Sequence, residues 1–208
     1  MSSLGSLAGH RIVPVIVIDD AAQAADLARA LAAGGILCAE VTFRTPAAAD
    51  AIRAMAEVAG FTVGAGSVVR PDQLEAAHDA GASFIVSPGF DREIVDLTRE
   101  RGMGSLPGIA TATEALVAMR AGIDTVKFFP ADKLGGLGTI RALAAPLQGL
   151  GFVPSGGVTA LDAPTYLADA AVPAVSGSWM ATRSMIASGD FATIERVSTE
   201  SVQAIGRV

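Results

Sequence analysis

The stretch Ile36-Leu-Cys-Ala-Glu-Val-Thr-Phe-Arg44 is short, apolar and rich in residues that favour β structure, and a segment of helical composition follows it. The same alternation recurs along the whole chain. The apolar runs begin near eight positions: Ile12, Ile36, Phe61, Ala82, Met103, Ile123, Phe152 and Val172. Eight strand-helix units in about 200 residues predict an α/β protein with a parallel sheet closed as a (β/α)8 TIM barrel.

A doubly wound sheet is the alternative arrangement, and it requires a glycine-rich turn after the first strand. The corresponding segment, Val17-Ile-Asp-Asp20, contains no glycine. No long linker or change of composition divides the chain. We therefore expect one barrel domain spanning residues 1–208, with residues 1–11 as an N-terminal extension.

Several residues mark the expected ends of helices. Thr45-Pro46 predicts a capping residue followed by proline at the first helical position, and Thr111 with Glu114 has the spacing of a capping box. Gly81 and Gly122 stand where two helices are expected to stop.

Composition restricts the functions that the chain can have. Apolar residues make up 51% and charged residues 17%, but the apolar residues come in short runs, never in the ~20 consecutive residues of a membrane-spanning helix. A net charge of -6 without a cluster of basic residues argues against nucleic acids and anionic membranes as partners. The first ten residues lack the features of a secretory signal, so we expect a cytoplasmic protein.

The histidines and the single cysteine do not predict a metal site. Cys38 lies in an expected strand, His10 near the N-terminus and His78 in an expected outer helix. These separations do not match the ligand spacing of a structural zinc site, and one cysteine cannot form an internal disulfide.

Lys127 is one of only two lysines, and it stands inside the apolar run Ile123-Asp-Thr-Val-Lys-Phe-Phe-Pro130. Thirteen arginines supply the rest of the positive charge. An ammonium is costly to remove from water, and lysine, unlike arginine, can lose its proton and attack a carbonyl. We therefore predict that Lys127 forms an imine with a 2-oxo acid. The alternative is a lysine at a strand end whose head group reaches water.

Glu40 and Arg44 alternate with the apolar residues Val41 and Phe43. If the apolar pair packs against the helices, the acid and the guanidinium face the interior of the barrel, as Lys127 does by the same argument. Glu40 is then predicted to act as general acid and base, and Arg44 to bind a substrate carboxylate. The alternatives are that Glu40 only pairs with a cation and that Arg44 is a surface residue.

Two glycine-bearing loops follow the last two expected strands, at 154–158 and 176–179. Barrels frequently bind phosphate at these loops, so we predict phosphate contacts from Gly156, Gly157, Gly177 and Ser178. Further substrate-contact residues are expected at the mouth of the barrel, namely Ser67, Pro88, Phe129 and Ser155. Turn geometry alone is the alternative explanation for these glycines and turn residues.

Seven motifs, in order along the chain, resemble those of the 2-keto-3-deoxy-6-phosphogluconate aldolase family, which also includes 4-hydroxy-2-oxoglutarate aldolases. They are EVTFRT at 40–45, GAGSV at 64–68, SPGF at 87–90, PGIAT at 107–111, VKFFPA at 126–131, PSGGV at 154–158 and SGSW at 176–179.

The resemblance implies a homotrimer of (β/α)8 barrels that splits 2-dehydro-3-deoxy-6-phosphogluconate into pyruvate and glyceraldehyde 3-phosphate, without a metal or organic cofactor. It assigns imine formation to Lys127, acid-base catalysis to Glu40 and carboxylate binding to Arg44. The chain departs from the family pattern at Ser67 and Ser155, where threonine is usual. It also departs at Ser176, which replaces a glycine, and in a shorter segment before the first strand.

Three other functions remain open from the sequence. The first is cleavage of 4-hydroxy-2-oxoglutarate to pyruvate and glyoxylate, in which a carboxylate stands where the other substrate has phosphate. The second is a barrel isomerase or epimerase that uses the phosphate loops without a covalent nucleophile. The third is a barrel that binds a ligand without turning it over.

Overall fold

The protein was analysed as a computed structural model that describes residues 3–206. Within them lie nine strands, which are β1 (Ile12–Ile16), β2 (Cys38–Thr42), β3 (Thr62–Gly66), β4 (Phe84–Val86), β5 (Gly104–Leu106), β6 (Gly108–Ile109), β7 (Thr125–Phe128), β8 (Gly151–Pro154) and β9 (Val175–Gly177). The helices are α1 (Ala24–Ala33), α2 (Ala48–Ala56), α3 (Pro71–Asp79), α4 (Arg92–Glu100), α5 (Ala112–Arg120), α6 (Gly136–Ala144), α7 (Ala163–Leu167), α8 (Arg183–Ala187) and α9 (Phe191–Ile205). Three short 3-10 helices are η1 (Gly5–Leu7), η2 (Ala21–Gln23) and η3 (Ala131–Leu134).

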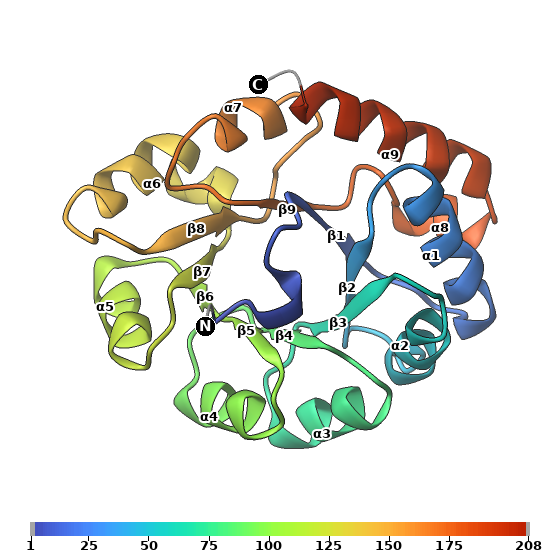
Figure 1. Cartoon of the computed structure of the whole chain (residues 1–208), viewed down its shortest axis with the longest axis horizontal. Coiled ribbons are helices and arrows are strands. Elements are labelled where there is room, and N and C mark those ends of the chain that lie inside the picture. Colours follow the sequence, from blue (N-terminus) through green and yellow to red (C-terminus); the bar gives the residue numbers. More distant parts are fainter. Residues whose placement is uncertain (1–2, 207–208) are drawn as a thin grey trace.

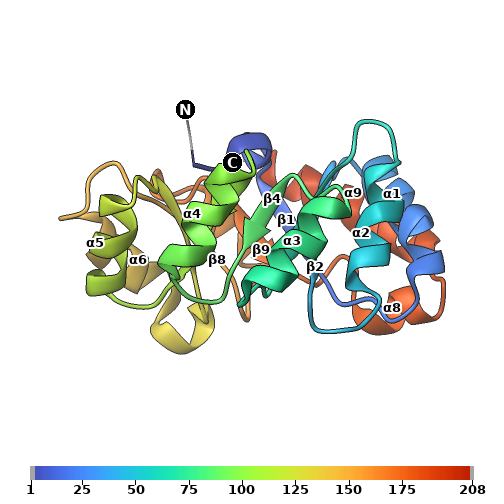
Figure 2. The same ribbon diagram turned by 90° about the horizontal axis from the view of Figure 1, so that it is seen from below.

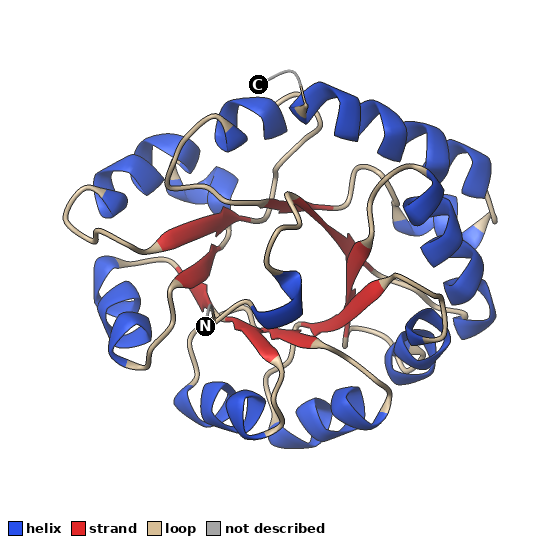
Figure 3. Cartoon of the chain, viewed as in Figure 1, coloured by secondary structure: helices blue, strands red, loops and turns tan. Residues whose placement is uncertain are grey.

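The strands curl around a common interior, and the helices lie outside them (Figures 1 and 3). Every strand pair is parallel. Hydrogen bonding divides the strands into a six-stranded sheet, ordered β5-β4-β3-β2-β1-β9, and a three-stranded sheet, ordered β6-β7-β8. A bridge between Ser155 and Ser176 joins the two sheets on one side. The predicted α/β class with parallel strands is therefore confirmed.

All eight apolar runs contain a strand, but the fifth run contains β5 and is followed at once by β6. Pro107 separates the two, because proline has no amide hydrogen to donate to a ladder. The expectation of one uninterrupted strand in that unit is wrong. The expected N-terminal extension begins with residues 1–2, which lie outside the described residues.

The expected helix ends are mostly confirmed. The Thr111 and Glu114 side chains form a full capping box at α5, and Gly81 and Gly122 follow α3 and α5 with left-handed backbone angles. The prediction at Thr45 is wrong, since α2 begins only at Ala48. The Thr45 hydroxyl instead donates to the carbonyl of Ile18, in the loop that follows β1, at 2.5 Å.

The core has an outer and an inner part. The outer part fills the space between the sheets and the helices, and the inner part fills the interior of the curled strands. The inner part includes Val13, Cys38, Phe84 and Val153, and it is covered at the amino ends of the strands by Leu4 and Leu7 from the segment around η1. Figures 1 and 2 show η1 lying across this end of the ring of strands. The chain thus closes one end and leaves the other for a site.

Among residues 3–206, no helix combines the length and apolar character that crossing a membrane demands.

The reactivity of Cys38, the single cysteine, reports whether the inner core is closed to solvent. Cys38 is fully buried, its Sγ lies 3.3 Å from the Ile12 carbonyl oxygen, and loss of hydration raises the pKa of the thiol to about 12. Because the thiolate is the reactive form, we expect iodoacetamide at about pH 8 to leave Cys38 unmodified in the native protein. Intact mass spectrometry should show labelling only after denaturation. Rapid labelling of folded protein would contradict this arrangement.

Candidate active site

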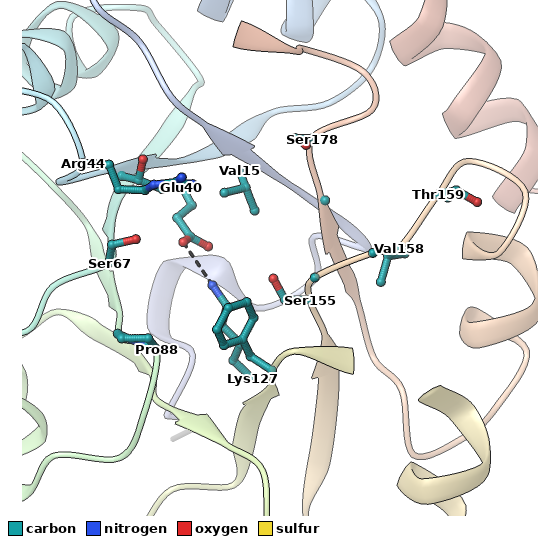
Figure 4. Close-up of a pocket in the computed structure, with 15 residues that line it drawn as sticks. Val15, Glu40, Arg44, Ser67, Pro88, Lys127, Ser155, Val158, Thr159 and Ser178 are labelled. Atoms are coloured by element: carbon teal, nitrogen blue, oxygen red, sulfur yellow. Dashed lines mark hydrogen bonds and ion pairs between the residues drawn. The ribbon is translucent and has the colours of Figure 1, made fainter. Parts of the chain in front are cut away.

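A cavity of about 350 Å³ opens at the carboxyl ends of the strands (Figure 4). It brings together all eleven residues predicted for the site. The lining consists of Val15, Glu40, Thr42, Arg44, Ser67, Pro88, Lys127, Phe129, Ser155, Gly156, Gly157, Val158, Thr159, Gly177 and Ser178. Of the residues that the sequence prediction did not include, Val15 was detectable, since it alternates with the inward-facing Val13 on β1.

Lys127 and Glu40 form an ion pair inside the ring of strands. The Nζ atom donates to Oε1 of Glu40 at 3.2 Å, and the two side chains are 8% and 1% exposed. Lys127 comes from β7 and Glu40 from β2, so the pair spans the interior, as Figure 4 shows. The alternative in which the Lys127 head group reaches bulk water is therefore wrong.

The second carboxylate oxygen of Glu40, Oε2, is buried and has no hydrogen-bond partner among residues 3–206. A buried carboxylate oxygen without a partner carries a large desolvation cost. The cost is offset where the oxygen can accept a proton or a hydrogen bond from a molecule in the cavity. Glu40 is thus held by one oxygen and available through the other.

Glu40 lies directly against the main chain of β3. A Cβ placed on Gly66 would overlap the Glu40 carboxylate. Gly66 has no left-handed backbone angle, so it is the close approach of the acid that requires glycine at this position. The GAGSV motif therefore provides the space in which the acid stands.

Arg44 stands at the rim of the cavity, exposed, and makes no hydrogen bond or ion pair with the described residues. Its guanidinium is therefore free to receive an anion in a planar, two-bond contact. The alternative in which Glu40 only pairs with a cation left Arg44 or Lys127 as its partner, and the structure shows that the partner is Lys127.

Phe129 covers one side of the lysine. The ring centroid lies 5.7 Å from Nζ of Lys127, within the range of a cation-π contact, and the ring is packed against Gly156. Phe129 is 37% exposed, so it forms part of the wall between the lysine and solvent.

Two turns place the remaining contact residues. Ser67, which follows β3, has a left-handed φ of 56° and is the one non-glycine residue with positive φ among residues 3–206. Such backbone conformations are unfavourable and tend to occur at functional sites. In the turn after β4, the Ser87 hydroxyl donates to the Gly89 carbonyl at 2.7 Å, which fixes Pro88 beside the cavity.

The glycine loop after β8 turns through two successive left-handed residues, Gly156 at φ 89° and Gly157 at φ 77°. Gly157 lies against the carboxylate of Asp132, which was not foreseen from the sequence. A hydrogen bond from Lys133 holds the pKa of Asp132 below its usual range. The loop predicted to bind phosphate therefore has a carboxylate beside it, with an ammonium 2.8 Å from that carboxylate.

No cluster of three or more histidine, cysteine, aspartate or glutamate side chains suited to a metal ion occurs within residues 3–206.

A buried amine and carboxylate in a cavity at the carboxyl ends of parallel strands suit the class of enzymes in which a lysine attacks a carbonyl group. The sequence profile described as KDPG and KHG aldolase matches residues 5–197, and the chain belongs to this family.

Individual members of the family are similar over nearly the whole chain. A 2-dehydro-3-deoxy-phosphogluconate aldolase of Treponema pallidum is 44% identical over 197 residues, which is 94% of each chain. The KDPG aldolase of Legionella pneumophila, solved with pyruvate captured at low pH as a covalent carbinolamine intermediate, is 32% identical with a TM-score of 0.91, covering 97% of this chain and 98% of that one. The 2-keto-3-deoxy-6-phosphogluconate aldolase of Zymomonas mobilis, solved with 3-phosphoglycerate, is 37% identical with a TM-score of 0.86, covering 96% and 91%.

The contact between Gly66 and Glu40 yields a prediction. In Gly66→Ala the new methyl group displaces the Glu40 carboxylate, and since misplacement of a catalytic group by about 1 Å costs roughly 100-fold, we expect aldolase kcat to fall by about that factor. Steady-state kinetics measures it.

The matched control is Gly138→Ala in α6, where a new Cβ meets no atom within 4 Å. It should keep wild-type kcat and gain up to about 1 kcal/mol of stability, because alanine favours helix. Wild-type activity in Gly66→Ala would show that the position of Glu40 does not matter.

Proposed function

We propose that this chain is a class I aldolase, an aldehyde-lyase that cleaves 2-dehydro-3-deoxy-6-phosphogluconate to pyruvate and glyceraldehyde 3-phosphate. The observation that carries the proposal is the buried Lys127–Glu40 pair, 3.2 Å apart, in a cavity at the carboxyl ends of the strands. The relative from T. pallidum bears the name of this activity.

The proposal includes a single (β/α)8 barrel domain over residues 1–208, with β5 and β6 counted as one interrupted strand. Two contacts between the separate sheets support it. β5 of the larger sheet lies in contact with β7 of the smaller one, and Ser155 bridges Ser176 on the other side. A homotrimer in the cytoplasm, with no nucleic acid or membrane as partner, is part of the same proposal and follows from the family resemblance and the net charge.

The reaction begins with attack of the unprotonated Lys127 amine on the C2 ketone of the substrate. The nitrogen forms a bond to C2, and the carbonyl electrons take up a proton to give a carbinolamine. Loss of water then leaves an iminium. Glu40 is the neighbouring group that can take the proton from nitrogen and return one to the departing oxygen. The carbinolamine captured in the L. pneumophila relative is the same kind of intermediate.

Cleavage follows because the iminium accepts an electron pair. A base removes the proton of the C4 hydroxyl, the C3–C4 bond breaks, C4 leaves as an aldehyde, and the bond electrons form an enamine. Protonation at C3 and hydrolysis release pyruvate and restore the amine. We assign these proton transfers, direct or through a water molecule, to Oε2 of Glu40, the carboxylate oxygen without a hydrogen-bond partner among residues 3–206.

Binding of the substrate uses the two ends of the cavity. Arg44 receives the carboxylate, with Ser67, Pro88, Phe129 and Ser155 around the carbon chain. The phosphate lies at Gly156, Gly157, Gly177 and Ser178, which line the cavity from two consecutive loops. The Z. mobilis relative, solved with 3-phosphoglycerate, supports a small phosphorylated acid as ligand.

Trapping of the imine tests the reaction type. Incubation with pyruvate and borohydride should add one reduced pyruvyl group to the protein, located at Lys127 by peptide mass spectrometry. Lys127→Met, which removes the amine at similar bulk, should take up no pyruvyl group and lose aldolase activity while staying folded. If the protein were an isomerase, or bound a ligand without turning it over, wild-type protein would form no pyruvyl adduct.

Comparison of the two aldol substrates tests the choice between them. If the glycine loops bind phosphate, kcat/KM should be at least tenfold higher for 2-dehydro-3-deoxy-6-phosphogluconate than for 4-hydroxy-2-oxoglutarate, about the effect of one charge-assisted hydrogen bond. A preference for 4-hydroxy-2-oxoglutarate would leave the imine mechanism intact and reverse the substrate assignment.

A further inference from the structure

The indole of Trp179 is anchored to the C-terminal helix. Its Nε1 donates to the Ser201 hydroxyl at 2.9 Å, and this hydroxyl donates to the Val197 carbonyl at 2.7 Å, one turn earlier in α9. A serine hydroxyl has one proton, so with that proton on Val197 the oxygen can only accept from the indole. Ser201 is 6% exposed, and the geometry of the pair is therefore fixed within a largely dry site.

The same indole forms the support under Gly177. A Cβ placed on Gly177 would overlap the six-membered ring of Trp179, and it would stand 3.2 Å from the Val158 carbonyl oxygen. Gly177 has no left-handed backbone angle, so the ring, and not the backbone conformation, excludes a side chain there. Trp179 thus packs directly against the end of β9, where the loop after β9 meets the loop after β8.

Neither Trp179 nor Ser201 lines the cavity. Trp179 meets the site at Gly177, next to Ser178, which lies away from the Lys127–Glu40 pair in Figure 4. Backbone groups bind an anion well only if they are held in place beforehand, because ordering them on binding lowers affinity. A connection from α9 to this one loop therefore affects the phosphate end of the cavity and leaves the amine end unchanged.

We propose that Trp179 and Ser201 are positioning residues that hold Gly177 and Ser178 for the phosphate group, and so set the preference for phosphorylated over phosphate-free ligands. This inference rests on the proposed aldolase function, and it assigns control of the phosphate end of the cavity to α9. Ser201 acts through Trp179, and Trp179 acts through the backbone of Gly177.

Two variants remove the connection without touching the cavity. Ser201→Ala removes the acceptor, and Trp179→Phe keeps a ring beside Gly177 but lacks the N–H donor. We expect each to raise KM for 2-dehydro-3-deoxy-6-phosphogluconate roughly 5- to 10-fold, the usual effect of one hydrogen bond, with kcat changed less than about twofold. The double variant should have a KM no higher than that of the single variant with the larger increase, because both changes break the same hydrogen bond.

A phosphate-free readout separates positioning from general loosening. The pyruvate concentration that half-saturates borohydride trapping reports only the Lys127 end, and it should match wild type in both variants. The matched control is Ser198→Ala on the same helix, which removes a fully buried hydroxyl that has no partner among residues 3–206. It should leave both KM and pyruvate saturation unchanged.

The outcomes distinguish the inference from the function on which it rests. Wild-type protein that traps no pyruvate overturns the aldolase proposal itself. The inference alone is overturned if wild-type protein traps pyruvate and cleaves the sugar acid but KM is the same in Ser201→Ala, Trp179→Phe and Ser198→Ala. The inference is also overturned if the half-saturating pyruvate concentration rises by the same factor as KM, since the substitution would then disturb the whole site and not its phosphate end alone. If Ser201→Ala does not fold, Trp179→Phe alone carries the test.

Discussion

The buried ion pair between Lys127 and Glu40 is the interaction on which the rest of the structure depends. Two charges that are almost fully removed from water are tolerable only with close mutual contact and support from their surroundings. The fold supplies both, because β2 and β7 face one another across the interior. Gly66 makes room for the acid, and the inner core with its cover of Leu4 and Leu7 keeps bulk water from the opposite end. A proton that passes from Lys127 to Glu40 leaves the net charge of the pair unchanged. The amine can therefore form without a charge entering or leaving the interior.

The sequence predicted those features that depend on local periodicity. Alternation along a strand placed Glu40 and Lys127 on the inward side, and the spacing of Thr111 and Glu114 predicted a capping box that the structure contains. The side chain of Thr45, expected as a cap, finds a better acceptor in a loop carbonyl that is 27 residues away. The helix propensity of a single residue carries no information about such a distant partner. The helix was therefore predicted to begin at Pro46, two residues before its actual start at Ala48.

Contacts between segments far apart in the chain were beyond prediction for the same reason. The carboxylate of Asp132 lies beside Gly157, and the indole of Trp179, which excludes a side chain at Gly177, is bonded to a serine of the C-terminal helix. Ser201, which fixes the indole, lies 22 residues further on and carries no motif. Its hydrogen bond to Trp179, in the loop that follows β9, connects this serine to the site. Eleven of the residues that line the cavity were therefore readable from the sequence, whereas Asp132, Trp179 and Ser201, which pack behind them, were not.

The charges around the cavity are compatible with the proposed anionic substrate although the protein has a net charge of -6. Lys127 and Glu40 neutralise each other, and so do Lys133 and Asp132 beside the glycine loop. Arg44 remains as a cation without a partner among the described residues. In the proposed binding mode a full charge draws a carboxylate to one end of the cavity, while at the other end backbone dipoles and neutral hydroxyl groups such as that of Ser178 are available for phosphate. Dipoles act over shorter distances than charges, so the geometry of the glycine loops must be held more tightly than the arginine. The indole packed beneath Gly177 meets that requirement.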